Sequence, residues 1–314
     1  MPRHLLGIRG LSKEQLLKLL DNGAHFAEVG ARDIKKVPAL RGKTIINLFL
    51  EASTRTRVSF EIAGKWLSAD TINVGGDSSV KKGETLLDTA RNLEAMNPDI
   101  IVVRHSESGA PHLLARYLER CSVINAGDGM HEHPTQALLD CITLRNHFKS
   151  RGGELRGRSI AIVGDVLHSR VARSNILAHQ ILGNHVRLVG PPTLVPKSLE
   201  ASYGDGVSVH HELAEGIAGA EVVMCLRLQK ERQTKHYLPS LEEYTREFGI
   251  TEKRLRANAP EAIILHPGPV NRGIEASSEV IDGPRSLVAD QVTYGVSARM
   301  AVLFDVAIGS QELA

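Results

Sequence analysis

The sequence predicts an α/β protein with two similar domains, each a mostly parallel sheet flanked by helices. Apolar, strand-like runs alternate with helical segments along the 314 residues. A polar, glycine-rich stretch at 150–154 interrupts this series, and a second series begins at Ser159. These observations predict a first domain of residues 1–149 and about 291–314, to which the C-terminal helix returns, and a second domain of residues 150–290.

Helix signals mark the first half of the chain. Ser12-Lys13-Glu14-Gln15 is a capping box, and the leucines that follow it lie on one helical stripe. Pro134 is expected at the first position of a helix that extends to about Lys149. The strands expected in this half are 44–50, 71–74, 100–103 and 123–124.

The second half repeats the alternation. Its expected strands are 159–163, 186–189, 207–209, 221–226 and 262–265. The polar, charge-rich stretch at 229–254 is expected to be a loop with short helices, and residues 290–308 a C-terminal amphipathic helix. No repeat of fixed period is present, so the chain is not a solenoid.

Composition excludes several classes of protein. Lys plus Arg is 38 and Asp plus Glu is 36, which gives a net charge of +2 and no basic surface for nucleic acid. The three cysteines are widely spaced, which disfavours a disulfide framework and predicts a reducing compartment. No stretch approaches about 20 consecutive apolar residues, so we expect a soluble cytoplasmic protein without membrane contact.

The segment Ser53-Thr54-Arg55-Thr56-Arg57 is the most informative part of the chain. It follows an apolar strand and leads into a helix, so its hydroxyl and guanidinium groups gather at a helix N-terminus. Unpaired N–H groups and the helix dipole make such a place suited to phosphate or another oxyanion. The alternative interpretation is an ordinary capped helix with two solvated arginines.

Polar residues also follow the other expected strands. In open parallel sheets, ligands bind beyond the carboxyl ends of the strands, so these segments predict a shared site for anions. The segments are Arg104-His105, 125–133, 164–170, Arg227-Leu228-Gln229 and His266-Pro267-Gly268-Pro269.

Other motifs fail on spacing. Gly42-Lys43-Thr44 resembles the end of a P-loop, but Val37 stands where its first glycine belongs. A dinucleotide site is unsupported because Gly164-Asp165-Val166 lacks the remaining glycines. His131-Glu132-His133 could ligate a metal, yet no third ligand has a convincing spacing, so no metal is expected.

Several segments together resemble the aspartate and ornithine carbamoyltransferase family. Residues 49–57 are similar to its carbamoyl-phosphate signature, and His133-Pro134-Thr135-Gln136 to its second shared motif. Three further segments favour the aspartate branch, and these are 81–85, 227–232 and His266-Pro267-Gly268-Pro269. The resemblance spans nearly the whole chain.

The resemblance implies a metal-free and cofactor-free enzyme that transfers the carbamoyl group of carbamoyl phosphate to L-aspartate in pyrimidine biosynthesis. It implies a homotrimer whose active sites are shared between chains. The first domain would bind carbamoyl phosphate and the second aspartate. Catalytic roles would fall on Arg55, Thr56, Arg104, His133 and Lys82. Carbamoyl-phosphate contacts would come from Ser53, Thr54, Arg55, Thr56, Ser78, Arg104, His133, Gln136, Pro267, Gly268 and Pro269, and aspartate contacts from Lys82, Arg170, Arg227 and Gln229.

Three alternatives stay open on the sequence. These are a carbamoyltransferase for another amine, an anion-binding subunit without turnover, and a dinucleotide-binding protein. The residue Val171 stands where the family has threonine, which removes a hydroxyl contact beside Arg170. Regulatory chains or a dihydroorotase-like protein remain possible partners, and no residue is identified as the base for the attacking amine.

Overall fold

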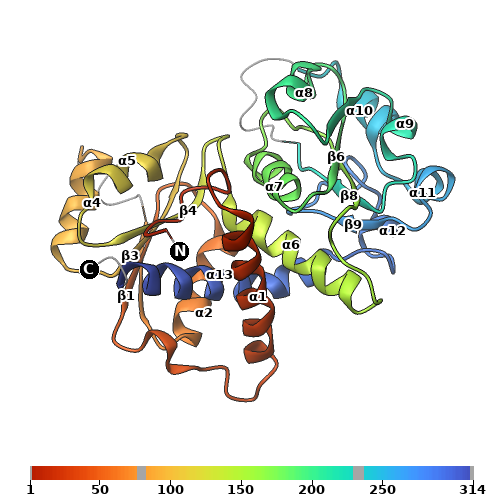
Figure 1. Ribbon diagram of the computed structural model, residues 1–314. Coiled ribbons are helices and arrows are strands. Elements are labelled where there is room, and N and C mark those ends of the chain that lie inside the picture. Colours follow the sequence, from red (N-terminus) through yellow and green to blue (C-terminus); the bar gives the residue numbers. More distant parts are fainter. Residues whose placement is uncertain (1, 76–82, 229–236, 312–314) are drawn as a thin grey trace. The chain divides into compact units, whose positions relative to one another are not determined.

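The computed structural model describes residues 2–75, 83–228 and 237–311 (Figure 1). The chain forms two compact units, one of Met1–Ile142 with Thr293–Ala314 and one of Thr143–Val292. The sequence placed the divisions at 149/150 and near 290/291. In the structure the divisions lie at 142/143 and 292/293. Both positions are inside helices, α6 (Pro134–Lys149) and α13 (Val288–Gln311), so each of these helices belongs partly to both units.

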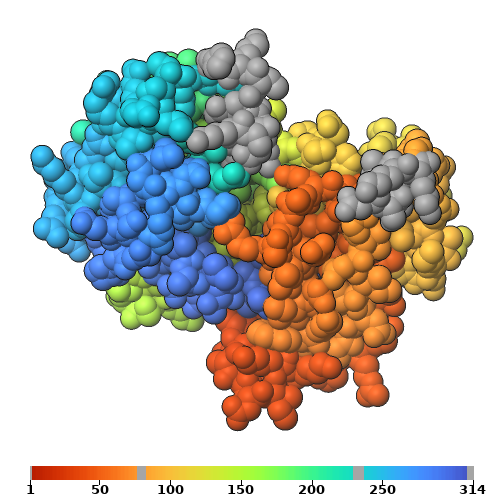
Figure 2. Space-filling view, turned by 180° about the vertical axis from the view of Figure 1, so that it is seen from behind, coloured from red at the N-terminus to blue at the C-terminus, as the bar shows by residue number. Residues whose placement is uncertain are grey.

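The first unit is built on a four-stranded parallel sheet in the order β2-β1-β3-β4. Its strands are β1 (Thr44–Phe49), β2 (Asp70–Gly75), β3 (Ile100–His105) and β4 (Ser122–Asp128). Helices α1 (Lys13–Gly30), α2 (Thr54–Trp66), α4 (Leu86–Ala95) and α5 (Ala110–Tyr117) accompany them, with a short 3-10 helix at Pro38–Leu40. The edge strand β2 is largely exposed (Figure 2, orange).

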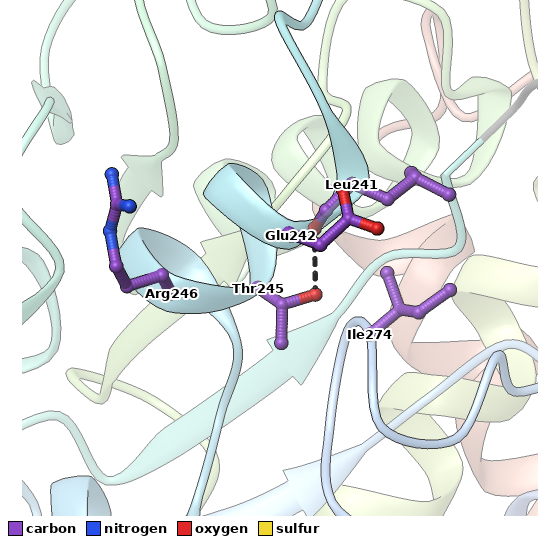
Figure 3. A pocket seen from close by; sticks show the side chains of 5 residues that line it. All are labelled: Leu241, Glu242, Thr245, Arg246 and Ile274. Carbon is purple, nitrogen blue, oxygen red and sulfur yellow. Dashed lines mark hydrogen bonds between the residues drawn. The ribbon is translucent and has the colours of Figure 1, made fainter.

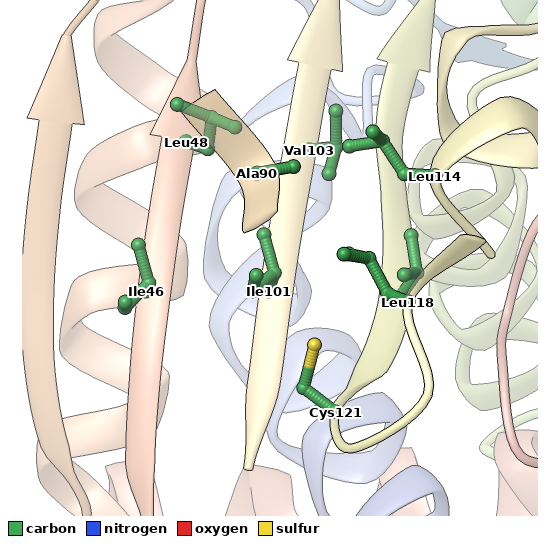
Figure 4. Close-up of a cluster of buried hydrophobic side chains, with 9 residues drawn as sticks. Ile46, Leu48, Ala90, Ile101, Val103, Leu114, Leu118 and Cys121 are labelled. Atoms are coloured by element: carbon green, nitrogen blue, oxygen red, sulfur yellow. The ribbon is translucent and has the colours of Figure 1, made fainter. Parts of the chain in front are cut away.

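The core of this unit explains why its central strands read as continuous apolar runs. Strands β1, β3 and β4 supply Ile46, Leu48, Ile101, Val103 and Val123 to one buried cluster (Figure 4). A parallel strand covered by helices buries both of its faces, so alternation with polar residues disappears. The rest of this cluster consists of Ala90 of α4, Leu114 of α5, and Leu118 and Cys121 of the segment between α5 and β4.

The cysteines behave as small apolar residues. Cys121, Cys141 and Cys225 are all buried and none forms a disulfide. Burial, with a smaller effect from nearby Glu94, raises the pKa of the Cys121 thiol to about 12. These thiols are therefore poor nucleophiles at neutral pH.

The second unit contains a five-stranded parallel sheet in the order β7-β6-β5-β8-β9. Its strands are β5 (Ser159–Val163), β6 (His185–Val189), β7 (Val207–His210), β8 (Val222–Cys225) and β9 (Ile263–Leu265). Its helices are α7 (Arg170–Ile181), α8 (Ser198–Tyr203), α9 (Leu213–Ile217), α10 (Leu241–Phe248), α11 (Glu252–Asn258) and α12 (Ser278–Ile281). Two parallel sheets flanked by helices confirm the predicted fold class.

The order of the second sheet identifies where a ligand can bind. The chain builds β5, β6 and β7 outward, then crosses back so that β8 pairs with the other side of β5. At such a switch point the loops after the two central strands separate and leave a crevice at their carboxyl ends. Here those loops follow β5 and β8.

The C-terminal helix α13 returns to the first unit, as predicted. Asn22 Nδ2 of α1 donates to Asp305 Oδ2 at 2.8 Å, and the rings of Phe26 and Phe304 meet edge to face at 5.6 Å. Gly23 of α1 faces both α6 and α13, because a Cβ there would lie 2.3 Å from Ile142 Cδ1 of α6 and 3.8 Å from the Ala298 Cα of α13. Figure 1 shows α13 beside α1.

The side chains of this helix are more deeply buried than the expected amphipathic pattern predicts. Nearly every residue from Gly295 to Gly309 is buried, including the charged Arg299 and Asp305. By length and composition Val288–Gly309 could cross a membrane, but 67% of its most apolar window is buried within the protein. The burial is what a core helix of a globular unit shows.

Candidate active site

The pairing of β1 with β3 brings two predicted segments to one edge of the first sheet. Phe49, the last residue of β1, is in register with Arg104 near the end of β3. The next N–H group, that of Leu50, donates to the Arg104 carbonyl at 2.9 Å. Glu51 Oε1 lies 3.5 Å from Arg104 Nη2, so the turn between β1 and α2 contacts the arginine directly.

Arg104 and His133 form the centre of the candidate site in this unit. Arg104 is 8% exposed, and its Nη1 donates to the Ala126 carbonyl of β4 at 3.1 Å. The same nitrogen lies 3.5 Å from Nε2 of His133, which is buried immediately before α6. Two predicted residues from distant segments are therefore neighbours, and both can donate to an oxygen of a bound anion.

The start of α2 differs from an ordinary capped helix. Ser53 is the N-cap residue in an extended conformation, yet its side chain makes no capping hydrogen bond. A serine that served only as a cap would accept a hydrogen bond from the first turn. Thr56 is buried, whereas Thr54 and Arg55 are exposed, so this helix end favours the oxyanion interpretation.

Gln136 is held in place by a residue to which the sequence reasoning assigned no role. Its Nε2 donates to Oδ1 of Asp140, one turn later on α6, at 3.0 Å. Asp140 is fully buried, and its charge acts on the equally buried Arg299 of α13. The spacing of four residues on one helix was the signal that could have identified Asp140.

Arg299 completes this buried cluster. Its Nη1 donates to the Gly295 carbonyl at 2.6 Å, and its guanidinium lies 5.3 Å from the centre of the Phe60 ring. Burial lowers the pKa of Arg299 to about 10, and the Asp140 carboxylate opposes that shift. The arginine therefore stays charged at neutral pH, with a counter-charge in the carboxylate that orients Gln136.

The three neighbours His131, Glu132 and His133 have separate surroundings. Glu132 is buried and accepts hydrogen bonds from the N–H groups of Ile8 at 2.7 Å and Arg9 at 3.3 Å, which fastens the N-terminal segment. The His131 ring lies 3.0 Å from Asp128, and His133 lies next to Arg104. Their side chains do not converge on one metal ion.

One group in the described part of the chain has potential metal ligands close together. Atoms of His112, Asp128 and His131 lie within 4.8 Å of one another. The Asp128 carboxylate already accepts hydrogen bonds from the Gly109 N–H at 2.7 Å and Asn125 Nδ2 at 2.8 Å. Burial raises the pKa of Asp128, but these bonds and the His131 contact hold it below its usual value. The Asp128 carboxylate is therefore already engaged by three groups of the protein.

In the second unit three predicted segments follow adjacent strands. Arg170 is the first residue of α7, only 3% exposed, and Ser169 caps that helix by accepting from the Ala172 N–H at 3.1 Å. Arg227 follows β8 and is half-buried. The turn after β9, Pro267 to Pro269, contains Gly268 at a φ of 63°, which favours glycine.

Three of the predicted site residues are not described, and none of the predicted site residues lines the pocket of the second unit. The predicted residues Ser78, Lys82 and Gln229 lie outside the residues that the structure describes. A pocket of the second unit is lined by Leu241, Glu242, Thr245, Arg246 and Ile274 (Figure 3). Within it Thr245 Oγ1 donates to the Leu241 carbonyl at 2.8 Å. None of the predicted site residues lines this pocket.

Known proteins resemble this chain along nearly its whole length. Residues 3–146 match the family model described as aspartate/ornithine carbamoyltransferase, carbamoyl-P binding domain, and residues 156–306 its Asp/Orn binding domain. The aspartate carbamoyltransferase catalytic subunit of Magnetococcus marinus is 54% identical, over 98% of this chain and 94% of that protein. That of Syntrophotalea carbinolica is 55% identical, over 98% and 96%.

Solved structures of carbamoyltransferases are also similar to this chain. The aspartate transcarbamoylase of Trypanosoma cruzi in complex with N-(phosphonacetyl)-L-aspartic acid is 30% identical with a TM-score of 0.83, over 96% of this chain and 94% of that one. The ornithine carbamoyltransferase of Gloeobacter violaceus is 29% identical with a TM-score of 0.80, over 98% and 99%. The fold alone therefore does not separate the two branches, whereas the sequence relatives favour aspartate.

Proposed function

Since this chain belongs to the aspartate/ornithine carbamoyltransferase family, we propose that it transfers the carbamoyl group of carbamoyl phosphate to the amino group of L-aspartate. The products are N-carbamoyl-L-aspartate and phosphate, and the reaction belongs to pyrimidine biosynthesis. The observation that carries the choice of aspartate is the identity of 52–56% with eight relatives that are all named as aspartate carbamoyltransferase catalytic subunits.

The first unit supplies the groups that we assign to carbamoyl phosphate. The hydroxyl, amide and guanidinium groups at the start of α2 bind its phosphate, because a helix N-terminus with an arginine attracts a dianion. Arg104 and His133, which lie 3.5 Å apart, donate with Thr56 to the carbonyl oxygen. The remaining contacts are assigned to Ser53, Thr54, Arg55, Gln136 and the turn Pro267, Gly268 and Pro269, with Ser78 from a neighbouring chain.

The mechanism is electrostatic and geometric. The amine of aspartate attacks the carbonyl carbon, negative charge grows on the carbonyl oxygen, and the carbon–oxygen bond to phosphate then breaks. Donors fixed at both oxygens stabilise this charge, and loss of one typically costs about 3–4 kcal/mol of barrier. Holding both reactants in line contributes roughly up to 7–11 kcal/mol more. No covalent nucleophile is needed, and the departing phosphate can accept the proton of the amine.

The second unit supplies the groups that we assign to aspartate. Arg170 and Arg227 stand at the carboxyl edge of its sheet, after β5 and β8, and a guanidinium binds a carboxylate through two parallel hydrogen bonds. Two such groups suit a dicarboxylate and repel a cationic amino acid such as ornithine. Gln229 and the Lys82 of a neighbouring chain complete this assignment.

Purified protein is expected to form N-carbamoyl-L-aspartate when it is given carbamoyl phosphate and L-aspartate. The product can be measured colorimetrically as its ureido group, with phosphate release followed in parallel. The matched control replaces aspartate with L-ornithine, from which we expect no citrulline. Product from ornithine but not from aspartate would move the protein to the sister branch.

We also propose that the working enzyme is a homotrimer with active sites shared between chains, as the resemblance implies. This assigns Ser78 and Lys82 to the site of a neighbouring chain. Regulatory chains or a dihydroorotase-like protein are candidate partners of the trimer. The free, buried thiols fit a reducing compartment, so we place the enzyme in the cytoplasm.

Mixing chains with two different defects is expected to restore activity. An Arg55→Ala chain and a Lys82→Ala chain are each expected to be nearly inactive as pure trimers. In mixed trimers some sites receive an intact Arg55 from one chain and an intact Lys82 from the next. The measurement is the specific activity of trimers that are dissociated, mixed, reassociated and separated by a charge tag. Mixed trimers without recovered activity would contradict the sharing of sites.

A further inference from the structure

The loop between β9 and α12 contains a buried carboxylate that the sequence reasoning did not select. Glu275 is 2% exposed, and its Oε1 accepts hydrogen bonds from the Leu228 N–H at 3.0 Å and from Asn271 Nδ2 at 2.5 Å. Its Oε2 accepts from the Asn271 N–H at 2.7 Å. A single carboxylate thus joins the segment after β8 to the segment after β9.

His266 extends these contacts into the turn at Pro267 to Pro269. The Gly268 N–H donates to His266 Nδ1 at 2.8 Å, so a neutral His266 ring has its proton on Nε2. That nitrogen lies 3.8 Å from Glu275 Oε2. The separation is too long for a hydrogen bond but short enough for electrostatic attraction in a buried place.

The carboxylate is itself fixed and ionised. The Glu275 carbonyl accepts from the Ile250 N–H at 2.9 Å, which holds its backbone against the segment that follows α10. Burial acts to raise the pKa of Glu275, but His266 and the N–H groups of Leu228 and Asn271 hold it below its usual value. The charge is therefore present throughout the neutral range.

The sheet alone does not align these two segments. The ladder between β8 and β9 ends at the pair Met224 and Leu265, before Arg227 and before His266. Beyond that pair both segments continue as loops, and the hydrogen bonds to Glu275 connect the two loops in place of a ladder. Leu228 follows directly after Arg227, so fixing the Leu228 N–H fixes the backbone that carries the arginine.

We propose that Glu275 is a positioning residue that holds Arg227 and the turn Pro267 to Pro269 in one fixed arrangement. The inference rests on the proposed function, in which Arg227 binds an aspartate carboxylate and the turn binds the carbamoyl amide. Glu275 touches neither substrate. It presents the two groups together, so that the amine of aspartate is aimed at the carbamoyl carbon.

The variant Glu275→Gln tests the proposal. An amide has one acceptor oxygen and one donor nitrogen, so it cannot accept on both sides and must turn its NH₂ group toward an N–H group. We expect kcat/KM for aspartate to fall roughly 10–100-fold, mainly through KM. The KM for carbamoyl phosphate is expected to rise by a smaller factor than the KM for aspartate, because only its carbamoyl amide contacts the turn and the residues assigned to its phosphate belong to the first unit. Steady-state kinetics with each substrate varied in turn measures this split.

The matched control is Glu279→Gln, an exposed glutamate four residues further along the chain, which is expected to behave as the parent protein. Glu275→Asp keeps both acceptor oxygens and is expected to recover part of the lost activity. It carries the test if the glutamine variant does not fold. A folded Glu275→Gln protein with an unchanged KM for aspartate would overturn the proposal.

Hydrogen exchange separates this proposal from the proposed function. Glu275→Gln is expected to speed exchange at the amides of Leu228 and Asn271 at least tenfold, with no change at the amides of β5. This result is independent of turnover. If the parent protein is inactive with aspartate but Glu275→Gln still speeds exchange at these amides, the proposed function is refuted and the positioning role is kept. Unchanged exchange at Leu228 would refute the positioning role alone.

Discussion

Replacing Arg55 by alanine is expected to lower kcat/KM for carbamoyl transfer by at least about 10²–10³ while the protein stays folded. The guanidinium lies in the first turn of α2, where it adds a full positive charge to the partial charge of the helix end. Negative charge moves onto the phosphate as it departs, so this contact strengthens in the transition state. Because the residue is exposed, its removal leaves no cavity and should change the free energy of unfolding by less than about 0.5 kcal/mol.

The control for this variant is Arg32→Ala, which removes an exposed arginine just beyond the C-terminal end of α1. It has the same change in net charge, so a general electrostatic effect on substrate approach would appear in both variants. Steady-state rates and urea unfolding curves of the two proteins decide the matter. Retention of more than about a tenth of the parent activity by Arg55→Ala would contradict the role we assign to it.

The variant Asp140→Ala is expected to lower the free energy of unfolding by about 3–5 kcal/mol. Asp140 is fully buried, and it supplies the negative charge that opposes the desolvation of Arg299. Truncation leaves a buried guanidinium without that counter-charge and also removes the acceptor of the Gln136 amide. Such a change is costly because a charge in an apolar interior is stabilised only by its partners.

Urea unfolding measures this loss as a lower midpoint at an unchanged slope. Asp140→Asn separates the two causes, because it removes the charge but keeps an oxygen that can accept from Gln136. We expect it to be about as destabilised as the alanine variant while retaining more activity at low temperature. Asp33→Ala, at an exposed position, is the control. Stability within 1 kcal/mol of the parent would show that Arg299 does not depend on Asp140.

The elements of the fold could be predicted from local signals. The Ser12 capping box is present in the structure, with the Gln15 N–H donating to Ser12 Oγ at 3.1 Å and Gln15 Oε1 accepting in return at 2.9 Å. The buried strands read as apolar runs because both of their faces are covered. Among the described strands the predictions differ from the structure at the strand ends, as in β4, which continues to Asp128 through residues expected in a loop.

The sequence by itself determined the family, the α/β class and the residue types of an anion site, because these depend on short-range patterns and on motifs that occur together. Tertiary structure alone decided which distant residues meet. Arg104 reaches His133 because β3 pairs with β4. Asp140 influences Arg299 because the C-terminal helix returns to the first unit. Glu275 joins the segments after β8 and β9 because those strands are neighbours. No spacing along the chain encodes such contacts, since they arise from the order of strands in a sheet and from the burial of charges that only packing can bring together.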